Sequence, residues 1–209
     1  MDFSLTNEQQ MIIDTLKTFV EQELYPHEAE VEKTNEIRPE LYAEIKQKAL
    51  DLGLYAANMP EEHGGAGLDS LTLCLMEREL GRANFGLQYI VGRPSNILLA
   101  CKGDQIENYL HASIRGDKVD CLAMTEPNAG SDVRSMQCRA ERDGDDFVIN
   151  GTKHFISHAD VADFVILFAA SGVEETPRGP KKKITSFLID KDTPGFTVEP
   201  GYNSVSHRG

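Results

Sequence analysis

The sequence predicts an α+β protein in which an N-terminal all-α helical domain, residues 1–118, precedes an antiparallel β-barrel or β-sandwich domain, residues 119–209. Two observations predict this order. In the first half, apolar residues recur at steps of three and four, which is the spacing of amphipathic helices. After Lys118 they come instead in short β-branched and aromatic runs, separated by Gly, Pro, Asn and Asp turn signals.

The composition is ordinary for a globular protein and excludes two classes. With a net charge of -13 over 209 residues, neither half has the basic surface that nucleic-acid binding requires. No apolar run approaches membrane-spanning length, and the acidic, polar N-terminus is neither a signal nor a transit peptide. The four cysteines form no C-x-x-C pair, which favours reduced core thiols over disulfides or zinc ligands. We therefore expect a cytoplasmic protein.

Helix signals follow one another along the first half. Thr6 and Gln9 form a capping box, and the helix that they begin should end near Pro26, with a charged extension past a kink. Pro39 begins the next helix, which Gly53 ends. Further helices are expected from Asp69 or Ser70 to Gly81, within residues 87–100 with a bend or start at Pro94, and from Asp104 to Arg115.

Two features of the helical half have both a structural and a ligand-binding interpretation. Gly64, Gly65 and Gly67 permit a tight, irregular path, and the absence of a G-x-G-x-x-G pattern favours a structural loop over phosphate binding. Arg93 is either a solvated or ion-paired arginine or a contact to a substrate carboxylate in a pocket. The first interpretation of Arg93 is the favoured one.

The second half is expected to contain short strands. Asn150-Gly151 should turn a hairpin between the first two of them. The segment from Gly172 to Lys183, with two prolines and three consecutive lysines, is expected to be an exposed loop. The predicted strands are residues 147–150, 154–157, 164–168, 184–189 and 196–198.

The stretch from Cys121 to Ser135, CLAMTEPNAGSDVRS, is expected to organise the chain, with a short strand leading into a small-residue turn. Gly130 can take backbone angles that are closed to other residues, so the amides after the turn can point at one place. Ser131 and Asp132 then either cap the next segment or help these amides to hold an anionic group such as a phosphate.

Gly151 to Ser157, GTKHFIS, is the second informative stretch. On a strand, Phe155 and Ser157 would share a face, where they could pack on a flat heteroaromatic ring and hydrogen-bond to its edge. The alternative is a core phenylalanine beside a satisfied serine. His154 and His158 would lie about 13 Å apart on a strand, so no metal site is expected.

The first of these stretches resembles the first signature of the acyl-CoA dehydrogenase family. That signature has a small residue, an aliphatic one, Thr or Ser, Glu, two free positions, a small residue, Gly, Ser or Thr, Asp, two free positions and a small residue. The required positions are filled here by Ala123, Met124, Thr125, Glu126, Ala129, Gly130, Ser131, Asp132 and Ser135. The second stretch resembles the family's G-x-K-x-(W/F)-I-(T/S) run, with phenylalanine in place of the common tryptophan.

The resemblance implies FAD as the cofactor. Phe155 would pack against the isoalloxazine, and Ser157 would donate to the reactive flavin nitrogen. Ser131 would also meet the acyl-CoA substrate, and Lys181 lies where the family touches coenzyme A, although a run of three lysines also fits a solvated face. The implied cofactor-binding residues are Leu122, Ala123, Met124, Thr125, Gly130, Ser131, Phe155, Ile156 and Ser157, of which Leu122 departs from the tyrosine of some members.

By the same resemblance the chain corresponds to about the first half of a family subunit, so the β-domain is incomplete. The implied reaction is α,β-dehydrogenation of an acyl-CoA thioester in fatty acid metabolism, with hydride transfer to the flavin and reoxidation by an electron-transfer flavoprotein or similar acceptor. The family's catalytic base is a glutamate of the missing C-terminal bundle. We therefore assign no catalytic residue, and expect this chain to be inactive alone and the full-length protein to be a homo-oligomer, a tetramer.

Two alternatives remain open. One is another flavoprotein on the same scaffold, of the nitroalkane oxidase or flavin monooxygenase type. The other is a non-catalytic module that binds CoA or flavin.

Overall fold

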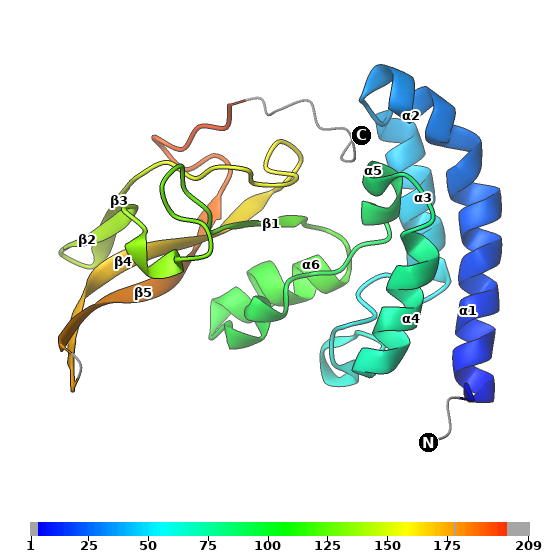
Figure 1. Ribbon diagram of the computed structural model, residues 1–209, viewed down its shortest axis with the longest axis horizontal. Coiled ribbons are helices and arrows are strands. Elements are labelled where there is room, and N and C mark those ends of the chain that lie inside the picture. Colours follow the sequence, from blue (N-terminus) through cyan, green and yellow to red (C-terminus); the bar gives the residue numbers. More distant parts are fainter. Residues whose placement is uncertain (1–3, 178, 200–209) are drawn as a thin grey trace. The chain divides into compact units, whose positions relative to one another are not determined.

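The computed structural model describes residues 4–177 and 179–199, which divide into two compact units between Asp117 and Lys118. The first unit is helical and the second is built on a β-sheet (Figure 1), so the predicted succession of a helical and a β half is confirmed. Among the described residues, no helix combines the length and the apolarity that crossing a bilayer requires.

Short helical segments follow one another through the first unit. Their apolar faces supply its core, where Leu16, Ile45 and Leu87 are almost completely buried. The elements are α1 (Asn7–Phe19), η1 (Val20–Leu24), η2 (Tyr25–His27), α2 (Glu28–Thr34), α3 (Pro39–Asp51), η3 (Glu61–His63), α4 (Ser70–Leu80), α5 (Phe85–Tyr89), η4 (Asn96–Ala100), η5 (Ile106–His111) and α6 (Ala112–Ile114).

Helix α1 begins at the predicted capping box. The Thr6 hydroxyl accepts a hydrogen bond from the Gln9 amide, and the Gln9 side chain accepts one from the Thr6 amide, each at 3.1 Å. After α1 the chain continues through the π-helical turn η1 and the 3-10 turn η2 into α2, so the extension past Pro26 is confirmed. The Asp69 carboxylate caps α4.

The glycine-rich loop after α3 is packed too closely for larger side chains. A Cβ at Gly65 would lie 2.1 Å from the carbonyl oxygen of Met59. Gly64 has a left-handed φ of +94° and ends the turn η3, and the Gly67 amide donates to the Met59 carbonyl at 2.8 Å. These contacts give the glycines the structural role that the sequence favours.

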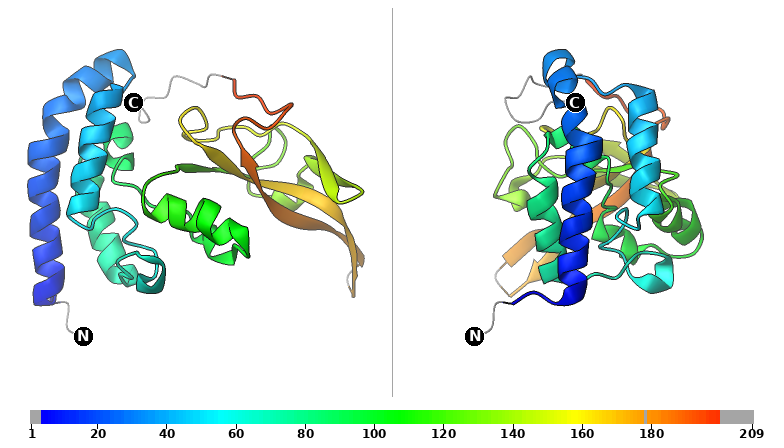
Figure 2. Two further views of the ribbon diagram at one scale, coloured as in Figure 1. Left: turned by 180° about the vertical axis from the view of Figure 1, so that it is seen from behind. Right: turned by 90° about the vertical axis from the view of Figure 1, so that its right-hand side faces the viewer.

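Strand β4 (Phe164–Thr176) is the central strand of the second unit. Strand β5 (Gly179–Asp190) pairs with it antiparallel along its whole length, and the two form a long twisted ribbon (Figure 2). The other edge of β4 is shared by β1 (Asp120–Ala123), which runs parallel to it, and β2 (Arg139–Asp143), which joins it through a parallel bridge. Strand β3 (Asp146–Asn150) forms a hairpin with β2. The sheet is therefore mixed rather than wholly antiparallel.

One face of this sheet is covered by the loop that follows β3. Ala162 and the half-buried Ile156 of this loop pack on the face and close its core. The buried side chains beneath them come from β1, β2, β4 and the residues just before β2, and they are Cys121, Ala123, Cys138, Ala140, Val165, Leu167 and Ala169.

Two expected strands and one expected turn are wrong. Residues 154–157 form no strand, because Phe155 has a φ of +58°, in the left-handed region that a strand excludes. The chain therefore does not turn a hairpin at Asn150-Gly151. The hairpin of β2 and β3 turns instead at Gly144, whose φ is +62°. Residues 196–198 also form no strand.

The expected loop from Gly172 to Lys183 is also wrong, because it is mostly strand. A bulge between Ala170 and Gly172 shifts the register, and β4 and β5 then continue to pair. Beyond the bulge Glu174 stands opposite Lys181, so opposite charges face each other across the two strands.

Gly65→Ala tests the packing of the glycine-rich loop. The added methyl group meets the backbone of Met59, so we expect the free energy of unfolding to fall by about 3 kcal/mol. Urea denaturation followed by circular dichroism measures the change. The matched control is Gly130→Ala, where a Cβ meets nothing within 4 Å and only a small change is expected. Equal effects of the two substitutions would contradict the proposed packing.

Candidate functional site

The turn after β1 is closed by its own backbone. The Glu126 amide donates to the Ala129 carbonyl at 2.9 Å, and the Ala129 amide donates back to the Glu126 carbonyl at 3.2 Å. Pro127 and Asn128 form the exposed tip between them. This short bridge turns the Glu126 side chain inward, where it is buried.

The buried Glu126 carboxylate gathers three segments of the chain. It accepts hydrogen bonds from the Gln137 amide at 2.5 Å and the Cys138 amide at 2.9 Å, just before β2. It also forms an ion pair with Lys153, whose Nζ lies 2.8 Å away. Only 5% of the Glu126 side chain and 7% of the Lys153 side chain are exposed. A charge buried to this extent requires such partners.

The pKa of Glu126 lies below its ordinary value. Burial raises the pKa of this carboxyl, but hydrogen bonds from Gln137, Lys153 and Cys138, together with the Lys153 charge, outweigh the burial and lower it. Glu126 is therefore a carboxylate near neutral pH. Its lone pairs are directed at structural donors, so it is not a proton acceptor for a substrate.

Two further bonds hold the loop after β3 against the end of β1. The Lys153 Nζ donates to the Met124 carbonyl at 3.0 Å, and the His154 amide donates to the Thr125 carbonyl at 2.8 Å. At its start the same loop passes close to the entry to β2 at Gly151, where a Cβ would lie 2.6 Å from both Cα and Cβ of Cys138. The two stretches that the sequence singles out are thus joined in space.

The predicted flavin residues divide into exposed and packed groups. Leu122 is 43% exposed and Phe155 is 68% exposed, and Ser157 is also exposed. Ala123 is buried in the sheet core, and Ile156 packs against that core between Phe155 and Ser157. The remaining predicted residues, the half-buried Met124 and Thr125 and the exposed Gly130 and Ser131, lie at the end of β1 and in the turn that follows.

Because residues 154–157 are irregular, strand alternation does not place Phe155 and Ser157. Their exposure has a different origin: Ile156 anchors the loop on the sheet, and its two neighbours remain accessible on either side. The expected side-by-side arrangement on a strand face is therefore wrong. The Phe155 ring instead stacks on the neighbouring His154 ring, with centroids 4.0 Å apart.

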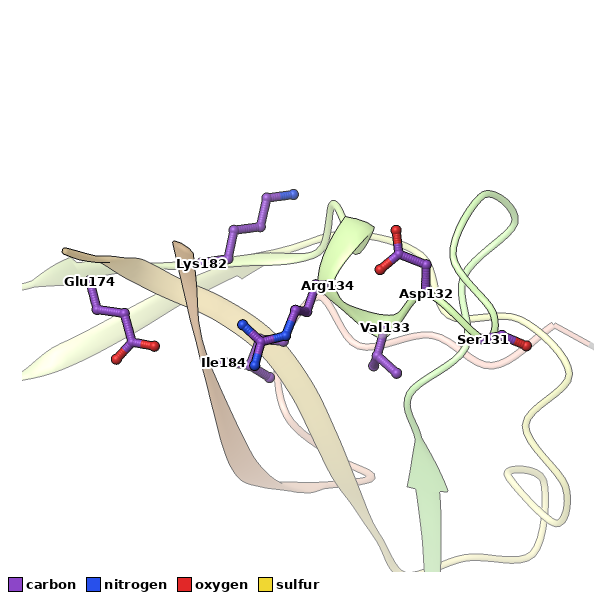
Figure 3. Close-up of a pocket in the computed structure, with 7 residues that line it drawn as sticks. All are labelled: Ser131, Asp132, Val133, Arg134, Glu174, Lys182 and Ile184. Carbon is purple, nitrogen blue, oxygen red and sulfur yellow. The ribbon is translucent and has the colours of Figure 1, made fainter. Parts of the chain in front are cut away.

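Ser131 lines a hollow of about 470 Å³ between the turn η6 (Val133–Ser135) and the β4–β5 ribbon (Figure 3). Its two cationic side chains are Arg134 and Lys182, and the Lys182 Nζ donates to the Met136 carbonyl at 2.7 Å. The other residues that line it are Asp132, Val133, Glu174 and Ile184.

Lys181, which the sequence puts forward as a CoA contact, does not line this hollow, whereas its neighbour Lys182 does. Successive residues of a strand point to opposite faces, so a shift of one position decides which lysine reaches a given site. Arg134 was missed because it occupies a free position of the signature. Arg134 is recognised as part of the hollow only in the structure, where η6 lies beside the β4–β5 ribbon.

Other candidates in the sequence have structural roles. Arg93 forms an ion pair with Glu77 at 2.6 Å, as favoured. All four cysteines are free; Cys121 and Cys138 are buried, and Cys74 is exposed rather than in the core as expected. Burial, followed by nearby Asp charges, raises the pKa of the Cys121 thiol to about 12, so it is not a nucleophile at neutral pH.

Lys153→Met tests the buried ion pair. Removal of the cation leaves the Glu126 carboxylate buried without its charged partner, so we expect a loss of about 3 to 5 kcal/mol in the free energy of unfolding. Denaturant titration measures the loss. The double substitution Glu126→Gln with Lys153→Met should recover part of it, because no buried charge remains. A loss no greater than that of a surface substitution would disprove the pairing.

The lowered pKa of Glu126 predicts a specific acid dependence. In the unfolded chain a glutamate titrates at about 4.3. Because the folded pKa is lower, this group contributes stability that is complete above about pH 5 and is lost as the pH falls through the folded pKa. We expect the difference in unfolding free energy between wild type and Glu126→Gln to shrink from pH 7 to pH 3.5. A constant difference would show that Glu126 does not titrate in this way.

Comparison with known proteins identifies two family domains. The profile described as acyl-CoA dehydrogenase, N-terminal domain, matches residues 6–117, and the one described as acyl-CoA dehydrogenase, middle domain, matches residues 121–209. Benzylmalonyl-CoA dehydrogenase of Aromatoleum aromaticum is 36% identical over 203 residues, which are 95% of this chain and 51% of that protein. Mitochondrial isovaleryl-CoA dehydrogenase of Pongo abelii is 32% identical over 210 residues, 98% of this chain and 49% of that protein.

A solved structure has a similar fold. Glutaryl-CoA dehydrogenase from Mycobacterium smegmatis, in complex with FADH2, matches with a TM-score of 0.81 at 27% identity, and the match covers 96% of this chain and 50% of that one. The chain thus spans about half the length of these relatives. The two domain profiles account for almost all of its residues, and the buried Glu126 and the loop that it holds lie within the range matched by the middle-domain profile. The protein belongs to the acyl-CoA dehydrogenase family.

Proposed function

We propose that this chain supplies the flavin-contacting and CoA-contacting half of an FAD-dependent acyl-CoA dehydrogenase. One observation carries the proposal: the Glu126–Lys153 pair and the bond from the His154 amide to Thr125 hold the two predicted flavin segments together. An ordinary strand corner does not require a buried ion pair to fasten a distant loop to it. A preorganised binding surface gains from such a fastening, because its groups then need little rearrangement when a ligand binds.

The side chains present fit a flavin. Phe155 offers an exposed aromatic ring, and Ser157 offers an exposed hydroxyl two residues away, on a loop anchored by Ile156. Thr125 and the backbone from Leu122 onward would face the same ring system, with Gly130 and Ser131 beyond the turn. FAD, when bound, supplies the hydride acceptor. The chain's own residues orient the ring and bond to its polar edge.

The hollow beside Ser131 supports a CoA thioester as the substrate class. Arg134 and Lys182 bring two cations to a surface of a strongly acidic chain, and both suit phosphate groups. Asp132 and Glu174 also line the hollow, so an anionic ligand would have to approach from the side of the two cations. Lys181, on the opposite face of β5, remains a second candidate for a contact to coenzyme A.

The α,β-dehydrogenation itself needs a base, and we place that base outside residues 1–209. Glu126 is unsuitable because its carboxylate is buried among backbone donors. The complete protein would pass electrons to a flavoprotein or a similar acceptor, and would act as a homo-oligomer in the cytoplasm. The half-length match to the relatives is consistent with a missing catalytic part.

FAD titration of the purified chain, followed by the change in flavin fluorescence, tests the site. We expect weak binding that Ser157→Ala reduces by about fivefold, which is the effect of losing one hydrogen bond of about 1 kcal/mol. Phe155→Ala should weaken binding through the loss of stacking. The matched control is Thr152→Ala, an exposed hydroxyl of the same loop outside the proposed set, which should leave the affinity unchanged. Equal effects at Thr152 and Ser157 would refute the assignment.

A dye-coupled assay with acyl-CoA substrates tests the location of the base. Because no residue of this chain is proposed to remove the α-proton, purified residues 1–209 saturated with FAD should show no turnover. Oxidation of an acyl-CoA by this chain alone would show that the base lies within it.

A further inference from the structure

The helical unit contains a pair of histidines that neither the sequence patterns nor the proposed function uses. His63 is the last residue of η3, and His111 is the last residue of the π-helical segment η5. Nδ1 of His63 lies 3.3 Å from Nε2 of His111, and the ring centroids are 5.5 Å apart at an angle of 47°. Both side chains are nearly one-third exposed, so solvent ions can reach them.

The neighbours of His111 determine which of its nitrogens carries a proton. Nδ1 lies 2.9 Å from the Glu107 carboxylate, and the other oxygen of Glu107 accepts from Arg115 at 2.9 Å. An ionised carboxylate can only accept, so Nδ1 of His111 carries the hydrogen. In the neutral ring, Nε2 is then a lone pair directed at Nδ1 of His63. A carboxylate behind a histidine, fixing its tautomer and orientation, is the usual outer partner of a metal-bound imidazole.

We propose that His63 Nδ1 and His111 Nε2 bind one divalent transition-metal ion of the Zn²⁺ type. Two ligands of a tetrahedral zinc ion, each about 2.0–2.1 Å from the metal, lie about 3.3 to 3.4 Å from each other. The observed separation of 3.3 Å matches the distance between two ligands of one ion. It is long for a hydrogen bond between the two rings.

The site has two protein ligands. Among the described residues, no group of three or more His, Cys, Asp or Glu side chains gathers as a metal site, so water completes the coordination. With His63 bound through Nδ1, its proton resides on Nε2, on the side of Glu62, whose Oε1 is 3.9 Å away. Imidazole pairs suit zinc, nickel and copper rather than magnesium or calcium, which prefer oxygen ligands.

Both histidines lie on hydrogen-bonded backbone; the His111 carbonyl accepts from the Arg115 amide at 2.9 Å. The His63 amide donates to the Pro60 carbonyl at 3.1 Å, and the next two amides close the same turn through Glu61 and Pro60. Gly65, just beyond, is packed against Met59. Ligands on fixed backbone lose little freedom when an ion binds. A bound ion would fasten the glycine-rich loop to η5 and so stabilise the helical unit. This inference concerns the helical unit alone and does not depend on flavin or acyl-CoA binding.

Calorimetric titration of the whole chain with Zn²⁺, repeated with Ni²⁺, tests the site. We expect one ion to bind per chain, accompanied by a rise in Tm. His63→Gln and His111→Gln should each remove this binding event and the rise in Tm. Glu107→Gln leaves both ligands in place but weakens the orientation of His111, so it should reduce the affinity by about tenfold. The matched control is His27→Gln, a histidine of η2 outside the pair, which should titrate like the wild type.

Each alternative outcome is decisive. If the wild type and His63→Gln titrate alike, or if His27→Gln removes the binding as His63→Gln does, the site is not where we place it. If the chain binds no Zn²⁺ or Ni²⁺ while circular dichroism shows the native fold, the pair is a hydrogen bond alone and the proposal fails. A Glu107→Gln variant with wild-type affinity would overturn the role given to that carboxylate.

Discussion

The second unit depends on the burial of one negative and one positive charge. Burial of either charged group without a partner would be very unfavourable, so Glu126 and Lys153 are buried together. The hydrogen bonds around them come from the turn after β1, the entry to β2 and the loop after β3. Breaking any of these contacts would leave a charge in a dry environment. The position of the proposed flavin surface is therefore set by electrostatics inside the protein, beneath the side chains that would contact the cofactor.

Local signals in the sequence predicted the helical half well. The capping box at Thr6, the Asp69 cap and the proline start at Pro39 act within three or four residues, and all are present. The β half was predicted less well because its decisive contacts join distant residues. The parallel pairing of β1 with β4 links Asp120 to Phe164, and no periodicity within either strand indicates which neighbour it will have.

At the candidate site, too, the local sequence patterns were predictive and the contacts between distant residues were not. The resemblance named the two stretches, but alternation of side chains on an assumed strand gave a wrong geometry for Phe155, because the backbone there is left-handed. Lys182 and Arg134 were overlooked because their places depend on the bulge after Ala170 and on the pairing of β4 with β5. The three lysines were expected in an exposed loop, whereas pairing across the strands, such as that of Lys181 with Glu174, makes them part of a ribbon.

The bulged ribbon has a consequence for association. Among the described strands, none pairs with the edge of β4 beyond Ala170, and a strand edge without a neighbouring strand is where a strand from another copy can add. The charged side chains of β4 oppose the addition of such a strand. Glu174 and Glu175 follow each other on this edge strand, and the same residues of a second copy would bring like charges together. These two acidic residues of β4 would thus hinder edge-to-edge association between copies of the protein.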